Sequence, residues 1–125
     1  MNQLTNIFKI LSDETRVRII ILLYQEELCV CELSGILDVP QSRISKNLSK
    51  LRDLNLVADE RKEKFVFYRL KTDNKLFLNT IENIMKDFDL YTQLTTDKNR
   101  LSIKEEFLNK CDNAQCLCIQ KSLGE

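Results

Sequence analysis

The sequence has no histidine, one proline and two glycines among its 125 residues. Because proline and glycine interrupt helices, their scarcity predicts helices with short connections. There is no run of about 18 apolar residues that could cross a membrane, and residues 1–3 do not open a signal peptide. We therefore expect a cytoplasmic protein, long enough for one domain with a modest core.

The absence of histidine also counts against an enzyme. A catalytic thiolate needs a neighbouring group that activates it, and no obvious base is available in this chain. Cys29 and Cys31 are separated by one residue, whereas thiol–disulfide enzymes use the spacing C-x-x-C. We predict no catalytic residues and no organic cofactor.

Charged side chains balance over the whole chain but are unevenly distributed along it. Residues 1–40 carry three basic and six acidic side chains, residues 41–71 carry nine and four, and residues 72–125 carry seven and nine. The central segment therefore has a net charge of +5, as a surface for phosphates requires. A solvated basic face would give the same pattern, so this observation needs support from the predicted fold.

Five cysteines in a reducing compartment are expected to be ligands or reactive thiols, because disulfides rarely persist there. Cys29 and Cys31 flank the start of a predicted helix. Residues two apart on a regular helix point about 200° from each other, so both sulfurs reach one ion only where the backbone is extended or unwound. Ligand binding would then deform the helix start. The alternative is that both are small buried hydrophobic residues.

The first two predicted helices are recognised by their apolar spacing. One covers residues 4–11, and the next is capped by Ser12 or Asp13 and contains the unbroken apolar run 19–23. That run is typical of a buried central helix.

A helix pair with a tight turn follows. After an extended stretch at 28–30, a third helix covers 30–37 and ends before Pro40, because the residue preceding a proline disfavours helix. A fourth helix begins at Gln41 and stops near Asn55, which can adopt the left-handed conformation.

Residues 57–60 and 65–70 are β-like and flank the charged tip 61–64, which predicts a hairpin. A helix pair followed by a basic hairpin is a winged helix-turn-helix, so the predicted fold is mainly α with one small β-hairpin. A long helix over 77–91 carries a heptad-like seam of Phe77, Ile81, Ile84, Phe88 and Tyr91.

A last helix starts at the capping-box sequence 102–105 and ends near Cys111. We divide the chain into a DNA-binding and dimerisation domain (1–95) and a C-terminal helix with a cysteine-containing tail (96–125).

In a winged helix-turn-helix the fourth helix enters the major groove, and its early polar residues face the bases. Later residues on this helix and the hairpin tip contact the backbone or the minor groove. The predicted DNA-contacting residues are Gln41, Ser42, Arg43, Ser45, Lys46, Asn47, Lys50, Arg61, Lys62 and Lys64. An ordinary amphipathic helix with a wet polar face is the alternative for this helix taken alone.

Residues 11–16 (LSDETR), 27–33 (ELCVCEL), 42–48 (SRISKNL) and 67–70 (FYRL) resemble the ArsR/SmtB family of bacterial metalloregulatory repressors. The resemblance covers roughly residues 4–95. It implies a homodimer that binds an imperfect inverted repeat of DNA and leaves it when a thiophilic metal or metalloid binds. The first helix and the 77–91 helix would form the dimer interface, or else pack within one subunit.

The sequence departs from this family at several positions. Asn47 replaces a frequent histidine, Glu63 replaces the usual wing glycine, and the lack of histidine removes the family's zinc site on the last helix. Ser34 stands where arsenic-responsive relatives often have a third cysteine. Because As(III) and Sb(III) prefer three thiolates, the third sulfur is predicted to come from the tail, from Cys111, Cys116 or Cys118. The alternatives are a two-coordinate site and a separate three-sulfur site formed by the tail.

Arsenite or antimonite is therefore the predicted inducer, bound by Cys29 and Cys31. Cadmium or lead is the alternative, because thiolates also bind these ions, although such relatives usually add N-terminal thiols and no cysteine precedes Cys29. A redox sensor that links one of the pair to the tail is a third reading. For the tail, the alternative is that its cysteines have no role. For the whole protein, a further alternative is a dimerising adaptor that does not bind DNA.

Overall fold

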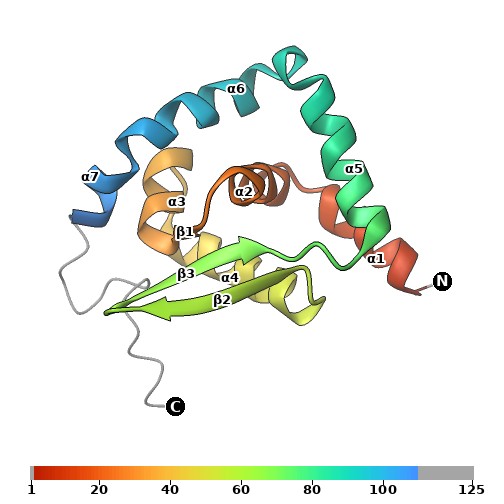
Figure 1. Cartoon of the computed structure of the whole chain (residues 1–125), viewed down its shortest axis with the longest axis horizontal. Helices are drawn as coiled ribbons and strands as arrows, with labels where there is room; N and C mark the ends of the chain where they lie inside the picture. The colour runs from red at the N-terminus through yellow and green to blue at the C-terminus, as the bar shows by residue number, and fades with distance from the viewer. Residues whose placement is uncertain (1, 110–125) are drawn as a thin grey trace.

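The computed structural model describes residues 2–109, so Cys111, Cys116 and Cys118 lie outside the described residues. Helices and one small sheet follow each other along the chain (Figure 1). They are α1 (Asn2–Leu11), α2 (Glu14–Gln25), β1 (Leu28–Cys29), α3 (Val30–Leu37), α4 (Gln41–Asp53), β2 (Val57–Lys62), β3 (Phe65–Leu70), α5 (Lys75–Lys86), α6 (Thr92–Asn99) and α7 (Lys104–Asn109), with 3-10 turns at Phe88–Leu90 and Arg100–Ile103. Among residues 2–109, no helix has both the length and the apolar character that crossing a bilayer requires.

The predicted winged helix-turn-helix is confirmed. Asp13, one of the two predicted caps, begins α2, and its Oδ2 accepts a hydrogen bond from the Arg16 N–H at 3.0 Å. Asp38 ends α3 with φ of 58°, and Asn55 follows α4 with φ of 64°, so both helices stop at left-handed residues.

The sheet has the antiparallel order β1-β3-β2. Leu28 lies opposite Tyr68 and Cys29 opposite Phe67, so the short β1 strand attaches the start of α3 to the wing. The two-residue turn of the hairpin has Glu63 at φ of 58°, a conformation that glycine adopts at lower cost.

The core is built around α2. Ile19, Ile20 and Leu22 have no exposed surface, as the apolar run predicted. Leu33 of α3 and Leu51 of α4 are also fully buried and belong to the same hydrophobic cluster. The two helices of the helix-turn-helix are therefore held against one common support.

The predicted long helix over 77–91 is wrong in its length. α5 ends at Lys86, and Asp87 has φ of −109° and ψ of 29°, which is not helical. Phe88 then lies in a 3-10 turn, and the exposed Tyr91 precedes α6. The apolar spacing continues through this break because Phe88 packs into the core from the turn instead of from a helix.

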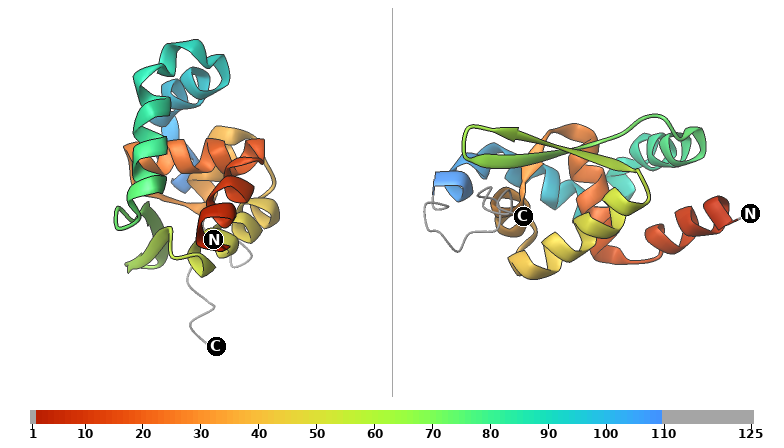
Figure 2. Two further views of the ribbon diagram at one scale, coloured as in Figure 1. Left: turned by 90° about the vertical axis from the view of Figure 1, so that its right-hand side faces the viewer. Right: turned by 90° about the horizontal axis from the view of Figure 1, so that it is seen from below.

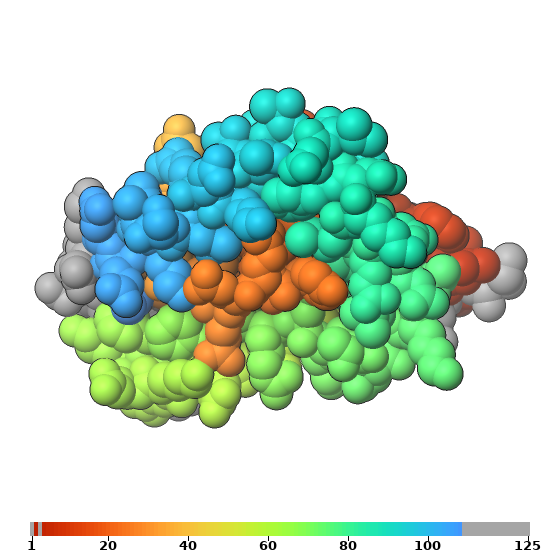
Figure 3. Space-filling view, turned by 45° about the horizontal axis from the view of Figure 1, so that its top comes forward, coloured from red at the N-terminus to blue at the C-terminus, as the bar shows by residue number. Residues whose placement is uncertain are grey.

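The chain beyond this break forms a C-terminal arm, which we define as residues 92–109. α5, α6 and α7 run as an arc over α2, from the side of α1 to the side of α3 (Figure 1), and the space-filling view shows α6 and α7 covering part of α2 (Figure 3). The sequence did not predict α6, and the boundary drawn between residues 95 and 96 falls inside it. The predicted last helix is observed as α7.

α7 is seated on α3 at Gly35. A Cβ atom at this position would lie 2.2 Å from the ring of Phe107, and Arg100 Nη2 donates a 3.0 Å hydrogen bond to the Gly35 carbonyl. Glycine inside a helix costs about 1 kcal/mol relative to alanine. The close approach of the ring accounts for glycine at this position.

Replacing Gly35 with alanine should separate α7 from α3. The added methyl group overlaps the Phe107 ring, and overpacking of this kind costs about 1–3 kcal/mol, partly offset by better helix propensity. We expect faster limited proteolysis within the C-terminal arm and a lower free energy of unfolding in urea. The double variant Gly35→Ala/Phe107→Ala should recover part of the loss, and a single variant as protected as the wild type would contradict this packing.

Candidate functional site

The thiol pair lies at the junction of the wing and α3. Cys29 is fully buried and ends β1, where its extended backbone (φ −97°, ψ 174°) makes it the residue that caps α3. Cys31 is 6% exposed and lies in the first turn of the helix. Only one of the two cysteines is therefore helical, and the extended backbone needed for both sulfurs to share a ligand is already present at Cys29.

A capping box closes the start of α3. The Cys29 sulfur accepts from the backbone of Glu32, and Glu32 Oε1 accepts from the Cys29 N–H at 3.1 Å. This is the S/T-x-x-E arrangement with cysteine in the place of the hydroxyl residue. A ligand on the Cys29 sulfur would compete with this acceptor role.

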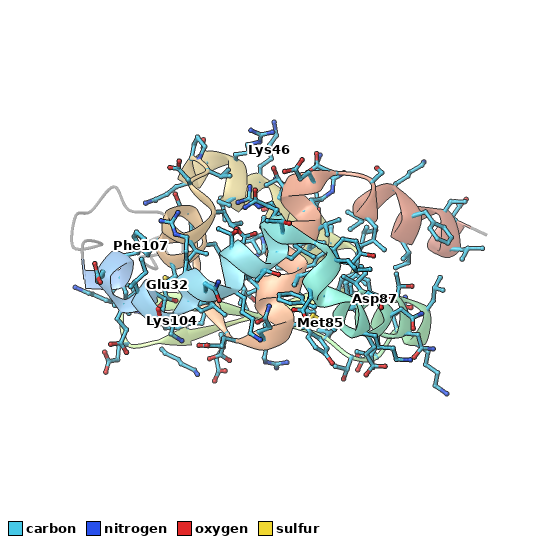
Figure 4. All side chains as sticks on the ribbon, turned by 90° about the horizontal axis from the view of Figure 1, so that it is seen from above. Glu32, Lys46, Met85, Asp87, Lys104 and Phe107 are labelled. Atoms are coloured by element: carbon cyan, nitrogen blue, oxygen red, sulfur yellow. The ribbon has the colours of Figure 1, made fainter. Side chains whose placement is uncertain are left out.

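Glu32 is itself unusual, because this acidic residue is only 2% exposed. Burial raises the pKa of Glu32 above its ordinary value, while the hydrogen bond from the Cys29 N–H and the charge of Lys104 act in the opposite direction. Glu32 and Lys104 lie close together where α7 passes α3 (Figure 4). Lys104 also pairs with Glu26, so the arm contributes a positive charge beside the thiol pair.

Cys31 contacts the start of α4 directly. Gln41, the first residue of α4, donates from Nε2 to Cys31 Sγ at 3.4 Å. Cys31 is in the disulfide form in this structure, whereas Cys29 is a reduced, buried thiol. Binding of a metal or metalloid by both sulfurs therefore starts from the reduced protein.

The turn between α3 and α4 is fixed by Ser34. Its hydroxyl donates to the Val39 carbonyl at 2.6 Å, and its own carbonyl accepts from the Val39 N–H at 3.2 Å. Ser34 is three residues after Cys31, where a third thiolate would lie on the same helix face. In this chain that position closes the helix-turn-helix.

The donor set fits a thiophilic ligand with two sulfurs. Within residues 2–109, no group of three or more His, Cys, Asp or Glu side chains could hold a metal ion. Two thiolates select soft ions over magnesium or calcium. The residues that the structure describes supply no third thiolate at this site.

Most of the predicted DNA-contacting residues of α4 are on its surface. Ser42, Arg43, Lys46 and Lys50 are exposed, while Gln41 and Ser45 are half-buried. Ile44, Leu48 and Leu51 pack inward, which leaves the polar face outside. Lys46 points away from the body of the molecule (Figure 4).

Asn47 corrects the prediction for this helix. It is 7% exposed, its Nδ2 donates to the Arg43 carbonyl at 3.0 Å, and its Oδ1 accepts from Arg16 Nη1 at 3.3 Å. The same guanidinium donates from Nε to the Ile10 carbonyl at 3.0 Å. Asn47 therefore ties α4 to α2 and the end of α1, and its amide faces the protein.

The wing presents Arg61, Lys62 and Lys64 on its exposed tip. Arg61 Nε donates to the Glu63 carbonyl at 3.2 Å, and Lys62 pairs with Glu27 just before β1. The Glu27 charge and its hydrogen bond raise the pKa of Lys62. Both side chains remain on the surface of the wing.

Two parts of the site were not predicted from the sequence. Glu32 carries a local signal, because C-x-x-E has the spacing of a capping box. The contact between Gln41 and Cys31 has no local sequence signal, since the two residues belong to different helices.

Comparisons with known proteins agree with this geometry. Residues 13–59 match the model of the arsR family of bacterial regulatory proteins. The chain is 46% identical over 65 residues to the arsenic resistance transcriptional regulator ArsR1 of Pseudomonas putida, covering 51% of each chain. It is 49% identical over 65 residues to the arsenical resistance operon repressor of Escherichia coli, covering 51% of this chain and 56% of that protein.

The chain thus aligns with about half the length of these two relatives. Among solved structures, HlyU from Vibrio cholerae superposes with a TM-score of 0.62 and 30% sequence identity. That alignment covers 68% of this chain and 90% of HlyU. Residues 13–59, which match the family model, contain the helix-turn-helix and the thiol pair.

Proposed function

Because this chain belongs to the arsR family of bacterial regulatory proteins, we propose that it is a cytoplasmic transcriptional repressor released from operator DNA by arsenite or antimonite. The inducer binds Cys29 and Cys31. One observation carries the proposal: Cys29 pairs with the wing strand and Cys31 contacts the first residue of the DNA-reading helix. A ligand on these two sulfurs acts on both DNA-contacting elements.

The DNA-contacting surface consists of the exposed face of α4 and the wing tip. On α4, the long side chains of Arg43 and Lys46 reach toward the DNA bases, and Lys50 contacts phosphate. Arg61, Lys62 and Lys64 contact the backbone or the adjacent minor groove. The net charge of +5 over residues 41–71 supports this assignment.

The protein acts as a homodimer in this proposal. Leu4 and Phe8 of α1 and Leu76 of α5 are large apolar side chains that are 37%, 58% and 37% exposed. Leu4 and Phe8 lie in the first helix predicted to form the interface, and Leu76 lies in α5, just before the predicted 77–91 segment. α1 extends at the end of the molecule opposite α7 (Figure 2). Two-fold symmetry of the protein then requires an imperfect inverted repeat in the operator.

Release follows from the geometry of the thiol pair. Each As–S bond forms as a thiol gives its proton to a hydroxyl group of arsenite, which leaves as water. A ligand shared by both sulfurs favours an open capping box, and α3 then no longer supports α4 in the DNA-bound position. A coupling of about 3 kcal/mol weakens DNA binding more than 100-fold.

The third thiolate comes from Cys111, Cys116 or Cys118. α7 packs on α3 and ends at Asn109. Cys111 is the second residue after Asn109 in the sequence. Trivalent arsenic prefers three thiolates, and the described residues supply only two in this region.

The test measures binding of the reduced protein to a duplex that the wild type has selected from a random pool. Arsenite should weaken the wild-type complex at least about 100-fold, and Cys29→Ser and Cys31→Ser should bind DNA normally but not respond. Arg43→Ala is the control that weakens DNA binding at every arsenite concentration. A reduced wild type that stays on DNA with arsenite and antimonite would reject the proposal.

A redox-responsive repressor is the second candidate. A disulfide between Cys29 and Cys31 would be strained, whereas a link from one of them to a tail cysteine would not be, and the same assay separates the two functions. Release by diamide without arsenite, reversed by dithiothreitol, would favour the redox function. Release by cadmium or lead alone would favour the metal-ion branch.

A further inference from the structure

We propose that Gln41 is shared between the inducer site and the operator, and that the bound inducer holds its amide on Cys31. This inference rests on the proposed function and deepens it. Gln41 begins α4 at the position from which a recognition helix reads base edges. Its Nε2 instead donates to Cys31 Sγ at 3.4 Å, and the side chain is half-buried.

The two uses of the amide exclude each other. A glutamine reads adenine with its carbonyl oxygen and its N–H together. The side chain has to swing away from α3 to present both groups to a base. While Nε2 is bonded to the sulfur, Gln41 cannot make this contact.

The inducer changes the strength of the sulfur as an acceptor. A thiol or disulfide sulfur is a weak acceptor, whereas a thiolate bound to arsenic carries more negative charge and forms a stronger, charge-assisted hydrogen bond. Loading the site therefore favours the Gln41 conformation that cannot read DNA. By reciprocity, operator DNA that captures Gln41 weakens inducer binding by the same factor.

The surrounding structure lets the side chain switch without moving the helix. Ser34 holds the α3–α4 turn through the Val39 carbonyl, and the Pro40 carbonyl accepts from the N–H groups of Arg43 and Ile44 at 3.0 and 3.1 Å. These bonds hold Cys31 and the start of α4 within reach of each other in this structure. Gln41 is a positioning residue that adds to the deformation of α3.

The experiment compares Gln41→Ala and Gln41→Asn with Lys46→Ala in the reduced full chain, using the selected duplex and arsenite. Asparagine keeps the amide but is one methylene too short to reach Cys31 from the same backbone. We expect both Gln41 variants to bind arsenite about 10-fold more weakly without DNA. The ratio of DNA dissociation constants with and without arsenite should also fall about 10-fold.

Lys46→Ala should weaken DNA binding and leave that ratio and the arsenite affinity unchanged. A second readout needs no arsenite: the side-chain amide resonance of Gln41 should shift in Cys31→Ser and again when the duplex is added. If the wild type responds to arsenite and both Gln41 variants show the wild-type ratio of DNA dissociation constants with and without arsenite, the inference fails and the proposed function stands. If the wild type does not respond, both fail.

Discussion

Replacing Asp97 with alanine lowers the free energy of unfolding by about 3–5 kcal/mol, because it leaves a buried guanidinium without its counter-charge. Arg18 donates from Nε and Nη2 to the two carboxylate oxygens of Asp97 at 2.9 and 3.0 Å. The side chains are 14% and 2% exposed. Arg18 also donates to the Leu37 carbonyl at 3.2 Å, so this one residue joins α2, α3 and the C-terminal arm. Urea denaturation followed by circular dichroism measures the loss.

The exposed ion pair between Arg52 and Asp59 is the matched control. Its N–O distance of 3.0 Å is similar, but its side chains are 49% and 38% exposed. Asp59→Ala should therefore cost less than about 1 kcal/mol. The double variant Arg18→Met/Asp97→Leu should lose much less stability than Asp97→Ala, because no charge is left buried. Equal losses for Asp97→Ala and Asp59→Ala would show that the buried pair contributes no more than a surface one.

The same ion pair explains why α6, the first helix of the C-terminal arm, was not predicted. α6 has the sequence TQLTTDKN, in which Leu94 is the only large apolar residue, so no periodic pattern identifies it as a helix. Its attachment depends on a contact between residues 18 and 97, which lie 79 positions apart. Local patterns predicted α1 to α4 well because those helices bury continuous apolar faces. They failed where a polar contact from a distant helix holds the chain.

The candidate site also has parts that local sequence patterns predict and parts that only distant contacts determine. The sequence predicted the thiol pair, the polar face of α4 and the basic wing, because each depends on neighbouring residues. Asn47 was misplaced because it lies at the edge of the polar face, and only the position of Arg16 decides which way its amide points. The contact of Gln41 with Cys31 arises from packing of α3 on α4, and residue type alone does not reveal it.

Replacing Ser34 with cysteine should tighten arsenite binding about 100- to 1,000-fold in a chain whose tail cysteines have been removed. The background variant is Cys111→Ser/Cys116→Ser/Cys118→Ser, which under our proposal lacks the third sulfur. A cysteine three residues after Cys31 lies on the same helix face, and a tethered third ligand acts at a high effective concentration. Calorimetric titration of the reduced protein with arsenite measures the gain. In the wild-type background the gain should be small, because the tail already supplies a third thiolate.

Ser34→Ala in the same background separates coordination from structure. Ser34→Ala removes the 2.6 Å hydrogen bond to the Val39 carbonyl that closes the helix-turn-helix, and Ser34→Cys weakens it, since a thiol is a weak donor. Each should cost about 1 kcal/mol of stability, but only the cysteine should raise arsenite affinity. If Ser34→Cys binds arsenite no more tightly than Ser34→Ala, α3 cannot bring a third sulfur to the thiol pair. If the gain is equally large with the tail cysteines intact, the tail does not supply the third ligand, and Cys29 and Cys31 hold arsenic as a two-coordinate site.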